Sequence, residues 1–356
     1  MESNYKPIGQ LIEKVDERNT DGSVSTLVGL SIDKCFIKSV ANIIGTDLTK
    51  YKIIRKKYFA VSLMQVSRDE KIPVAMQTDY EVAIMSPAYP IFKVSDENII
   101  LPEYLDMWFK RAEFDREATF IAVGGVRGSM PWEDFCRMEV YVPPLEKQKE
   151  IVKAYRTITD RIALKQKIND NLEATAQAIY NETFINASKK HWNKGVVGDV
   201  LQLQRGHDLP RIKMNGGLYP VAGSTETIGY HDEYTTLAPV IVMGRSGNIG
   251  NPRIYFCNCW VHNTSLYVKN FYLSEPLWTF FLLKNLNYDS FVGGSAVPTL
   301  NRNDVHAYEI QVPPIELQKQ FSKQVYSFFI NIEKNNSEIS KLIELKNVVL
   351  ATISNL

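Results

Sequence analysis

The chain has 356 residues, with 41 lysines and arginines against 40 aspartates and glutamates, and a formal net charge of +1. This balance excludes a protein that binds nucleic acid through an overall basic surface, so any such footprint must be local. Four cysteines are too few for a disulfide scaffold and indicate a reducing cytoplasm, and no apolar run approaches the roughly 18 residues of a membrane span.

Residues 1–141 are predicted to form a first globular unit, because short apolar and β-branched runs alternate there with polar turns. The run Ile8–Ile12 is expected to be an opening strand. The spacing of apolar residues from Leu101 to Phe114, with Trp108 on the apolar side, predicts a helix. Further strands are expected at residues 53–54, Tyr58–Met64, Val82–Met85 and Ile91–Val94.

Residues 142–191 begin with Val-Pro-Pro-Leu-Glu and continue as a long helical pattern. Proline is tolerated in a first helical turn and Glu146 favours the positive N-terminus, so the helix is expected from Pro144 to about Asn186. Its apolar residues recur in steps of four and three, which is typical of a coiled-coil seam. The seam residues are Ile151, Tyr155, Ile158, Ile162, Asn169, Leu172 and Ile179.

Residues 192–311 repeat the outline of the first unit. An opening run at Val197–Leu201 is followed by strands at Val240–Met243 and Ser265–Val268, and Trp278 lies 170 positions after Trp108. Both units close with a Gly-Gly pair, at residues 124–125 and 293–294, and then an aspartate. The two units are therefore predicted to share a frame and to differ in their loops, which carry specificity.

Residues 312–356 repeat the long helix, again after Val-Pro-Pro. Two helices of equal phase and length are expected to pair with each other. Antiparallel pairing with full overlap would bring Asn169 and Asn335 face to face, whereas the alternative is that both amides point to solvent. The second set of seam residues is Phe321, Val325, Phe328, Ile332, Asn335, Ile339, Leu342 and Val349.

The chain is therefore predicted to be an internal duplication of class α+β. Two globular α/β domains, at residues 1–141 and 192–311, are separated by two long helices, at residues 142–191 and 312–356, that form an antiparallel coiled coil. A helix of this length spans about 65 Å at 1.5 Å per residue, which is more than a domain core needs. We expect the helices to hold two dissimilar units apart about a pseudo-twofold axis.

This order of domains and helices, each helix introduced by Val-Pro-Pro-[Leu/Ile]-Glu-x-Gln, resembles the specificity subunit of type I restriction-modification systems. The first unit ends in a variant motif at Arg127–Trp132, so the resemblance is carried mainly by the second unit. Its matching motifs are Tyr219–Gly223, Ile228–Tyr234, Gly244–Gly250 and Gly294–Pro298.

The resemblance implies a subunit whose two target-recognition domains recognise an asymmetric, bipartite site in double-stranded DNA, with an unread spacer between the halves. It implies that the coiled coil docks two modification (adenine methyltransferase) subunits, and that restriction (endonuclease) subunits can join. This chain would then have no catalytic residue and no cofactor. S-adenosylmethionine, and ATP and Mg for restriction, would be bound by the partner subunits.

The densest basic run of the first unit lies at residues 50–57, beside an aromatic residue and before a strand. Such a run can bind DNA phosphates, although it also fits a solvated face. Arginine and amide side chains near strand ends can read base edges by paired hydrogen bonds, with a plain surface turn as the alternative. The candidates are Lys50, Lys52, Arg55, Lys56, Lys57, Ser67, Arg68 and Gln77.

The second unit offers similar candidates in two glycine-containing stretches. Residues 205–213 are polar and basic and could hold phosphates, with His207 as a bystander. Residues 244–250 lack the lysine of a phosphate loop, so their glycines are expected to shape a hairpin. The candidates are Arg205, Arg211, Lys213, Arg245, Ser246 and Asn248.

Two other functions fit parts of the sequence. Ser86-Pro87-Ala88-Tyr89 is similar to the motif with which amino-methyltransferases hold a flipped adenine. Its second proline and the cofactor loop are missing, which argues against a self-contained DNA adenine methyltransferase. The coiled coil alone would fit a scaffold that binds only protein. Cys257 and Cys259 lack a second thiol pair, so we expect ordinary strand cysteines and no metal site.

Overall fold

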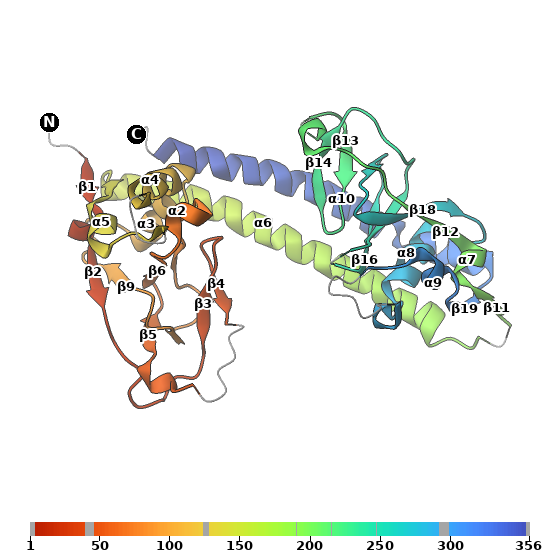
Figure 1. Ribbon diagram of the computed structural model, residues 1–356, viewed down its shortest axis with the longest axis horizontal. Coiled ribbons are helices and arrows are strands. Elements are labelled where there is room, and N and C mark those ends of the chain that lie inside the picture. The colour runs from red at the N-terminus through yellow and green to blue at the C-terminus, as the bar shows by residue number, and fades with distance from the viewer. Residues whose placement is uncertain are drawn as a thin grey trace. The chain divides into compact units, whose positions relative to one another are not determined.

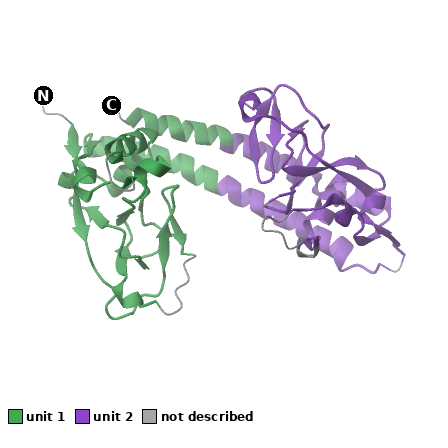
Figure 2. Cartoon of the chain, in the orientation of Figure 1, with its two compact units in different colours: residues 1–163, 340–356 green, residues 164–339 purple. Residues whose placement is uncertain are grey.

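The computed structural model (Figure 1) describes residues 4–39, 46–123, 128–189, 191–214, 216–246, 248–291 and 299–353. It has two compact units (Figure 2): unit 1 comprises Met1–Ala163 and Ser340–Leu356, and unit 2 comprises Leu164–Ile339. Within the described ranges, no helix has the length and apolar character to cross a membrane. The Gly-Gly pairs, Arg127, Gly247 and the motif Gly294–Pro298 lie outside the described residues.

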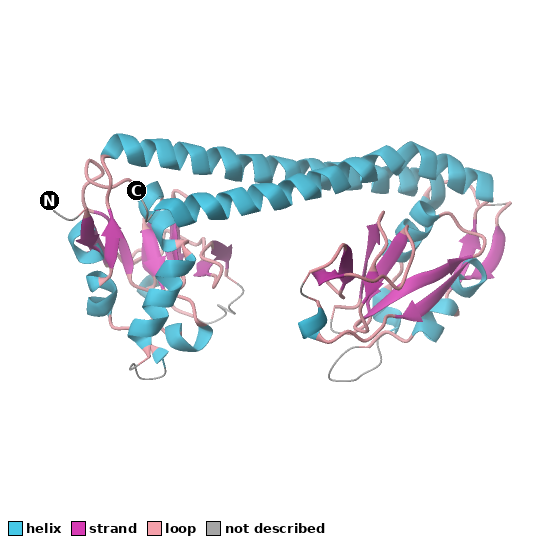
Figure 3. Ribbon diagram, turned by 90° about the horizontal axis from the view of Figure 1, so that it is seen from above, coloured by secondary structure: helices cyan, strands magenta, loops and turns pink. Residues whose placement is uncertain are grey.

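Two long helices contribute to both units. Helix α6 spans Leu145–Tyr180 and continues as a π-helical segment at Asn181–Ile185, and α10 spans Ile315–Thr352. The first part of α6 packs with the last part of α10 in the core of unit 1, and the remaining parts pack together in unit 2 (Figures 1 and 3). The helices therefore run antiparallel, which confirms the predicted coiled coil.

Every seam residue is at least half-buried. Near the middle of the seam, Asn335 Nδ2 donates to Asn169 Oδ1 at 2.8 Å, and Lys165 Nζ donates to Asn335 Oδ1 at 3.0 Å. The alternative, in which both amides point to solvent, is therefore wrong. Ile151, Ile158, Phe321, Val325 and Ile339 are buried, and Tyr155, Ile162, Asn169, Leu172, Ile179, Phe328, Ile332, Asn335, Leu342 and Val349 are half-buried.

Unit 1 consists of short antiparallel strands and helices (Figure 1). Its largest sheet has the order β2-β9-β6-β7, and the pairs β1-β10, β3-β4 and β5-β8 complete it. The strands are β1 Tyr5–Pro7, β2 Ile12–Val15, β3 Val28–Leu30, β4 Phe36–Lys38, β5 Lys52–Arg55, β6 Phe59–Val61, β7 Val74–Met76, β8 Val82–Met85, β9 Ile91–Val94 and β10 Glu139–Tyr141. The helices are α1 Ile8–Leu11, η1 Leu48–Lys50, α2 Val66–Asp69, α3 Pro102–Phe109, α4 Ala112–Ala122 and α5 Trp132–Arg137.

The core of unit 1 is an aromatic cluster on the four-stranded sheet. Phe59 and Phe92 stack with ring centroids 5.2 Å apart, and Phe109 of α3 meets Phe59 edge-on at 5.8 Å. Such pairs contribute about 0.5–1.5 kcal/mol beyond the area they bury. Ile151 of α6 and Ile353, next to the end of α10, belong to the same core. The first part of α6 and the end of α10 therefore complete the core of this unit.

Unit 2 repeats the plan with a larger sheet, β12-β18-β15-β16, beside a small sheet, β14-β13-β17, and the pair β11-β19. The strands are β11 Asn193–Val196, β12 Leu201–Arg205, β13 Tyr219–Ala222, β14 Thr227–His231, β15 Val240–Gly244, β16 Gly250–Tyr255, β17 Trp260–Val261, β18 Ser265–Phe271 and β19 Glu309–Val312. The helices are α7 Val197–Val200, η4 Arg211–Lys213, α8 Pro276–Lys284, η5 Tyr288–Phe291 and α9 Arg302–His306.

The core of unit 2 joins α8 to the two long helices. Tyr180 of α6 stacks on Phe281 of α8 with centroids 5.4 Å apart. Phe184, in the π-helical segment, meets Phe321 of α10 edge-on at 5.3 Å. Aromatic contacts therefore fix where α6 ends against α10 in this unit.

Each unit opens with a strand, one helical turn and a second strand, and this corrects the predicted opening strands at Ile8–Ile12 and Val197–Leu201. Ile8 and Leu11 of α1 are buried three residues apart, a spacing that suits one turn of helix rather than a strand. Gly9 lies so close to α5 that an added Cβ would be 3.0 Å from Cys136 Cβ. The helical turn therefore packs closely on α5.

The predicted helix from Leu101 to Phe114 is two helices in the structure. Arg111, between α3 and α4, has an extended backbone with φ −73° and ψ 142°. Its side chain is buried, and its guanidinium carbon lies 4.0 Å from the centroid of the Trp108 ring. This stacking places Arg111 against α3 and breaks the helical path.

Candidate nucleic-acid interface

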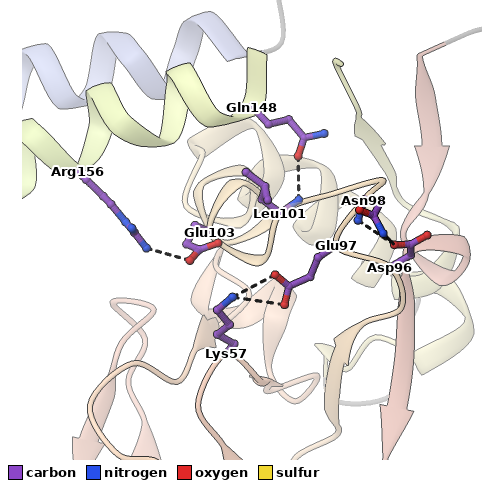
Figure 4. A network of polar contacts seen from close by, with 8 residues as sticks. All are labelled: Lys57, Asp96, Glu97, Asn98, Leu101, Glu103, Gln148 and Arg156. Atoms are coloured by element: carbon purple, nitrogen blue, oxygen red, sulfur yellow. Dashed lines mark hydrogen bonds and ion pairs between the residues drawn. The ribbon is translucent and has the colours of Figure 1, made fainter. Parts of the chain in front are cut away.

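The basic run at residues 50–57 lies around β5, and its cations face carboxylates. Lys57 contacts Glu97 at 3.1 Å (Figure 4), and Lys50 contacts Asp47 at 3.6 Å. The other pairs are Lys52–Asp16, Arg55–Glu17 and Lys56–Glu81. Because these carboxylates offset the positive charge, the run attracts phosphate less than its sequence suggests. Phosphate binding by Lys50, Arg55, Lys56 and Lys57 stays a prediction.

Two of the predicted DNA contacts are buried. Lys52 is 7% exposed and donates from Nζ to the carbonyl of Tyr89 at 3.3 Å. Gln77 is 0% exposed, and its Oε1 accepts a hydrogen bond from the N–H of Asp79 at 2.8 Å. This burial favours structural roles for both side chains, and their direct contact with DNA stays a prediction.

Arg68 remains at the surface of unit 1. It lies on α2 with its side chain 64% exposed, and it contacts Asp69 at 2.8 Å and Gln65 Oε1 at 2.6 Å. Ser67 is half-buried, and a Cβ added at Gly128 would lie 2.4 Å from its hydroxyl oxygen. Ser67 and Arg68 therefore lie beside Gly128, which belongs to the motif Arg127–Trp132. Contact of Ser67 and Arg68 with bases stays a prediction.

The topology of unit 2 brings Arg205 and Arg245 together. Arg205 is the last residue of β12, and Arg245 directly follows β15. Both strands run antiparallel to β18, which lies between them, so their C-terminal ends share one edge of the sheet. The Arg245 carbonyl accepts a hydrogen bond from the N–H of Leu300 at 2.8 Å, which draws the next segment to the same edge.

A third arginine, Arg302, joins this edge, and the sequence reasoning missed it. Arg205, Arg245 and Arg302 line one open cavity of about 480 Å³ with Leu266 at its wall. Arg205 and Arg302 are exposed, and Arg245 is half-buried. We name this the arginine pocket. Arg302 begins α9, and no local pattern in the sequence indicates that α9 packs beside β12.

A histidine fixes α9 against β12. The backbone N–H of Leu203 donates to His306 Nε2 at 2.8 Å, which requires that nitrogen to be unprotonated. Burial of the ring, and then the charge of Arg302, lower the pKa of His306 below its ordinary value of 6.5. The neutral ring therefore links the strand that carries Arg205 to the helix that carries Arg302.

The remaining candidates of unit 2 are Arg211, Lys213, Ser246 and Asn248. Arg211 and Lys213 are exposed on η4. Ser246 is half-buried in a bridge with Thr299, and Asn248 is exposed and accepts from Asn251 Nδ2 at 2.9 Å. Contact of these four with DNA stays a prediction.

His207, Cys257 and Cys259 are near other residues of unit 2. The His207 ring lies between those of Trp260 and Tyr267, with centroids 6.3 and 6.2 Å away. Cys257 is exposed, while the thiol of buried Cys259 donates to the Cys257 carbonyl at 3.3 Å. Among the residues that the structure describes, no cluster of three or more histidines, cysteines or carboxylates could hold a metal ion.

Comparison with known proteins finds one family model and solved structures of similar fold. The family model described as "Type I restriction modification DNA specificity domain" matches residues 46–174 and again 189–345. The crystal structure of the type I restriction-modification S subunit from M. genitalium has a TM-score of 0.62 at 13% identity, over 98% of this chain and 95% of that one. The HsdS subunit from Thermoanaerobacter tengcongensis has a TM-score of 0.37 at 14% identity, over 98% and 95%. No curated protein matched.

Proposed function

Because the chain belongs to the type I restriction modification DNA specificity domain family, we propose that it is the non-catalytic sequence-recognition subunit of a type I restriction-modification complex. Residues 1–141 and 192–311 are the two target-recognition domains, and residues 142–191 and 312–356 are the helices that space them. The family model matches twice, and each match takes in most of one globular segment and most of the helix that follows it.

The observation that carries the proposal is a duplicated frame with unlike surfaces. Each globular segment is closed by an antiparallel strand pair at its two ends, β1 with β10 and β11 with β19. The two units differ at the end of the main sheet: unit 1 has ion pairs there, and unit 2 has the arginine pocket. Two different domains on one frame support an asymmetric DNA site in two parts, whereas identical domains would fit a palindrome.

The same duplication supports the partners. A seam built from two similar helices offers two similar outer surfaces, which suits the docking of two modification subunits. Those subunits bind S-adenosylmethionine and methylate one adenine in each half of the site. Restriction subunits, with ATP and Mg, join the same complex.

Sequencing of DNA methylation in cells that carry this chain and its modification partner tests the proposal. We expect methylated adenines in two short, different motifs separated by a constant number of unread base pairs, and we expect them to disappear when this chain is deleted. An uninterrupted palindrome, or methylation that persists without the chain, would contradict the proposal.

The structure gives no support to a self-contained methyltransferase at Ser86–Tyr89. These residues form a tight turn in which the N–H of Tyr89 donates to the Ser86 carbonyl at 3.2 Å. The half-buried Tyr89 ring packs against the strand core around β5 and β8. The tyrosine that would stack on a flipped adenine is therefore engaged in the fold.

A further inference from the structure

The arginines of the two globular segments differ in their partners. In residues 4–141, each described arginine forms an ion pair with a carboxylate; these are Arg18, Arg55, Arg68, Arg111, Arg116 and Arg137. In the described part of residues 191–312, no arginine forms an ion pair; these are Arg205, Arg211, Arg245, Arg253 and Arg302. The described arginines of the second segment therefore lack the carboxylate partners that those of the first segment have.

Equivalent positions at the sheet edge carry opposite charges. Arg205 stands four residues after Leu201, the first residue of β12. Asp16 stands four residues after Ile12, the first residue of the corresponding strand β2. Asp16 contacts both Arg18 and Lys52, so the edge of unit 1 is occupied by an acid and its partners.

We infer that the arginine pocket binds a phosphodiester group of the DNA backbone, with Arg302 as its third member, and that the second recognition domain thereby supplies the larger share of the electrostatic affinity for DNA. This inference rests on the proposed function, because it names a contact within the proposed DNA interface. Guanidinium groups suit this ligand, since their planar fork donates paired hydrogen bonds to phosphate oxygens.

The surroundings of the pocket leave these guanidinium groups available. The nearest carboxylates in the sequence, Asp208 and Asp304, accept hydrogen bonds from the amides of Asn263 and Asn301. The Arg205 Nε donates only weakly, to the carbonyl of Asn263 at 3.3 Å. The cavity is open, so a phosphate that is part of a long duplex can enter it without a passage through the protein.

The test measures how DNA affinity depends on salt, with the full chain assembled with its modification partner. Each phosphate contact contributes about 0.9 to the slope of log K against log salt. We expect Arg302→Gln and Arg205→Gln each to lower that slope by about one and to weaken cognate and unrelated duplexes by the same factor. Arg302→Lys, which keeps the charge, should keep most of the slope. Arg116→Gln, at an exposed ion-paired arginine of unit 1, should leave it unchanged.

The outcomes separate this inference from the proposed function. If Arg302→Gln and Arg205→Gln left the salt slope unchanged and sequence-specific binding were retained, phosphate binding by the arginine pocket would be overturned. The recognition role of the chain would remain intact. If both variants abolished the binding of inorganic phosphate but left duplex binding unchanged, the pocket would be a site for a small anion. That result would also overturn the inference. A wild-type complex with no sequence preference would instead contradict the proposed function. Thermal unfolding curves that match the wild type show that the variants are folded.

Discussion

Gln148 accepts a hydrogen bond from the backbone N–H of Leu101, with its Oε1 2.9 Å from the amide nitrogen (Figure 4). Leu101 immediately precedes α3, so the glutamine caps that helix from the first turns of α6. Its Nε2 donates to the carbonyls of Ile99 and Pro143, both at 2.9 Å. The Gln148 side chain is fully buried, and its hydrogen bond to the Pro143 carbonyl is shielded from water.

Gln318 repeats the arrangement in unit 2. Its Oε1 accepts from the N–H of Glu275, directly before α8, at 3.0 Å, and its Nε2 donates to the carbonyls of Leu273 and Pro313. The glutamine of each Val-Pro-Pro-[Leu/Ile]-Glu-x-Gln motif therefore joins a long helix to the globular part of its own unit. This contact explains why each motif has a glutamine at this position.

Replacing Gln148 by leucine should destabilise unit 1 by at least about 1–3 kcal/mol, because that is the cost of one buried polar group left without a partner. Hydrogen exchange in a peptide that contains Leu101 should accelerate, while peptides of unit 2 should exchange as before. Lys147→Ala, at the exposed neighbouring position, is the control. Equal protection of the Leu101 amide in both variants would show that Gln148 does not hold α3 against α6.

The Asn169–Asn335 pair should be energetically coupled. In a double-mutant cycle with alanine at both positions, we expect a coupling free energy of about 0.5–2 kcal/mol in the chemical unfolding of unit 2. A cycle that combines Asn169→Ala with Lys319→Ala, far along α10, should be additive. Additivity of the asparagine pair itself would mean that it does not fix the register.

Insertions should distinguish the long helices from the loop that follows α6. Four residues added after Ala163 of α6 and after Ser340 of α10 lengthen both helices by about 6 Å, and coiled coils absorb such a four-residue stutter by local unwinding. At about 3.4 Å per base pair, the unread spacer should grow by one or two base pairs with both half-sites intact.

The matched control is the same insertion after Asn186. Phe184 is anchored in the core of unit 2, so residues added beyond it should enlarge a loop and leave the spacer unchanged. Methylation sequencing measures both variants. A spacer that stays constant in an active helix-insertion variant would show that the helices do not set the distance between half-sites.

Exchange of residues 192–311 for the matching segment of a relative should change one half-site and leave the other. The ends of this segment are adjacent, since Asn193 pairs with Val312 and Val196 with Glu309. A segment closed in this way can be replaced without a change in the seam. Methylation sites that changed in both halves at once would disprove independent recognition.

Acid should loosen the junction of α9 and β12. The folded-state pKa of His306 lies below 6.5, so the unfolded chain binds the proton more readily, and the contribution of His306 to stability is complete above pH 6.5. That contribution is lost as the pH falls through the folded-state pKa, because the protonated ring cannot accept from Leu203. Exchange of the Leu203 amide should therefore rise on acidification in the wild type and be high at every pH in His306→Ala.

The sequence was most informative where the pattern was local. Heptad spacing predicts the two helices, and their phase places Asn169 opposite Asn335. Most ion pairs of the basic run could not be predicted, because the partners are far apart in sequence; Lys57 and Glu97 are separated by 40 residues. Arg302 could not be predicted for the same reason, because only the packing of α9 beside β12 brings it close to Arg205. Helical turns as short as α1 resemble strands in sequence, since both consist of a few apolar residues.

Unit 1 is built from both the beginning and the end of the chain, and this has a consequence for biosynthesis. Leu350 and Ile353 belong to the same buried core as Phe59 and Phe92. Domains usually fold as units while the ribosome is still adding residues. Part of the core of unit 1 therefore stays exposed until the 176 residues of unit 2 and the last part of α10 have been translated. The second unit, whose residues 164–339 are continuous, can finish first. The order of completion is therefore the reverse of the order of synthesis.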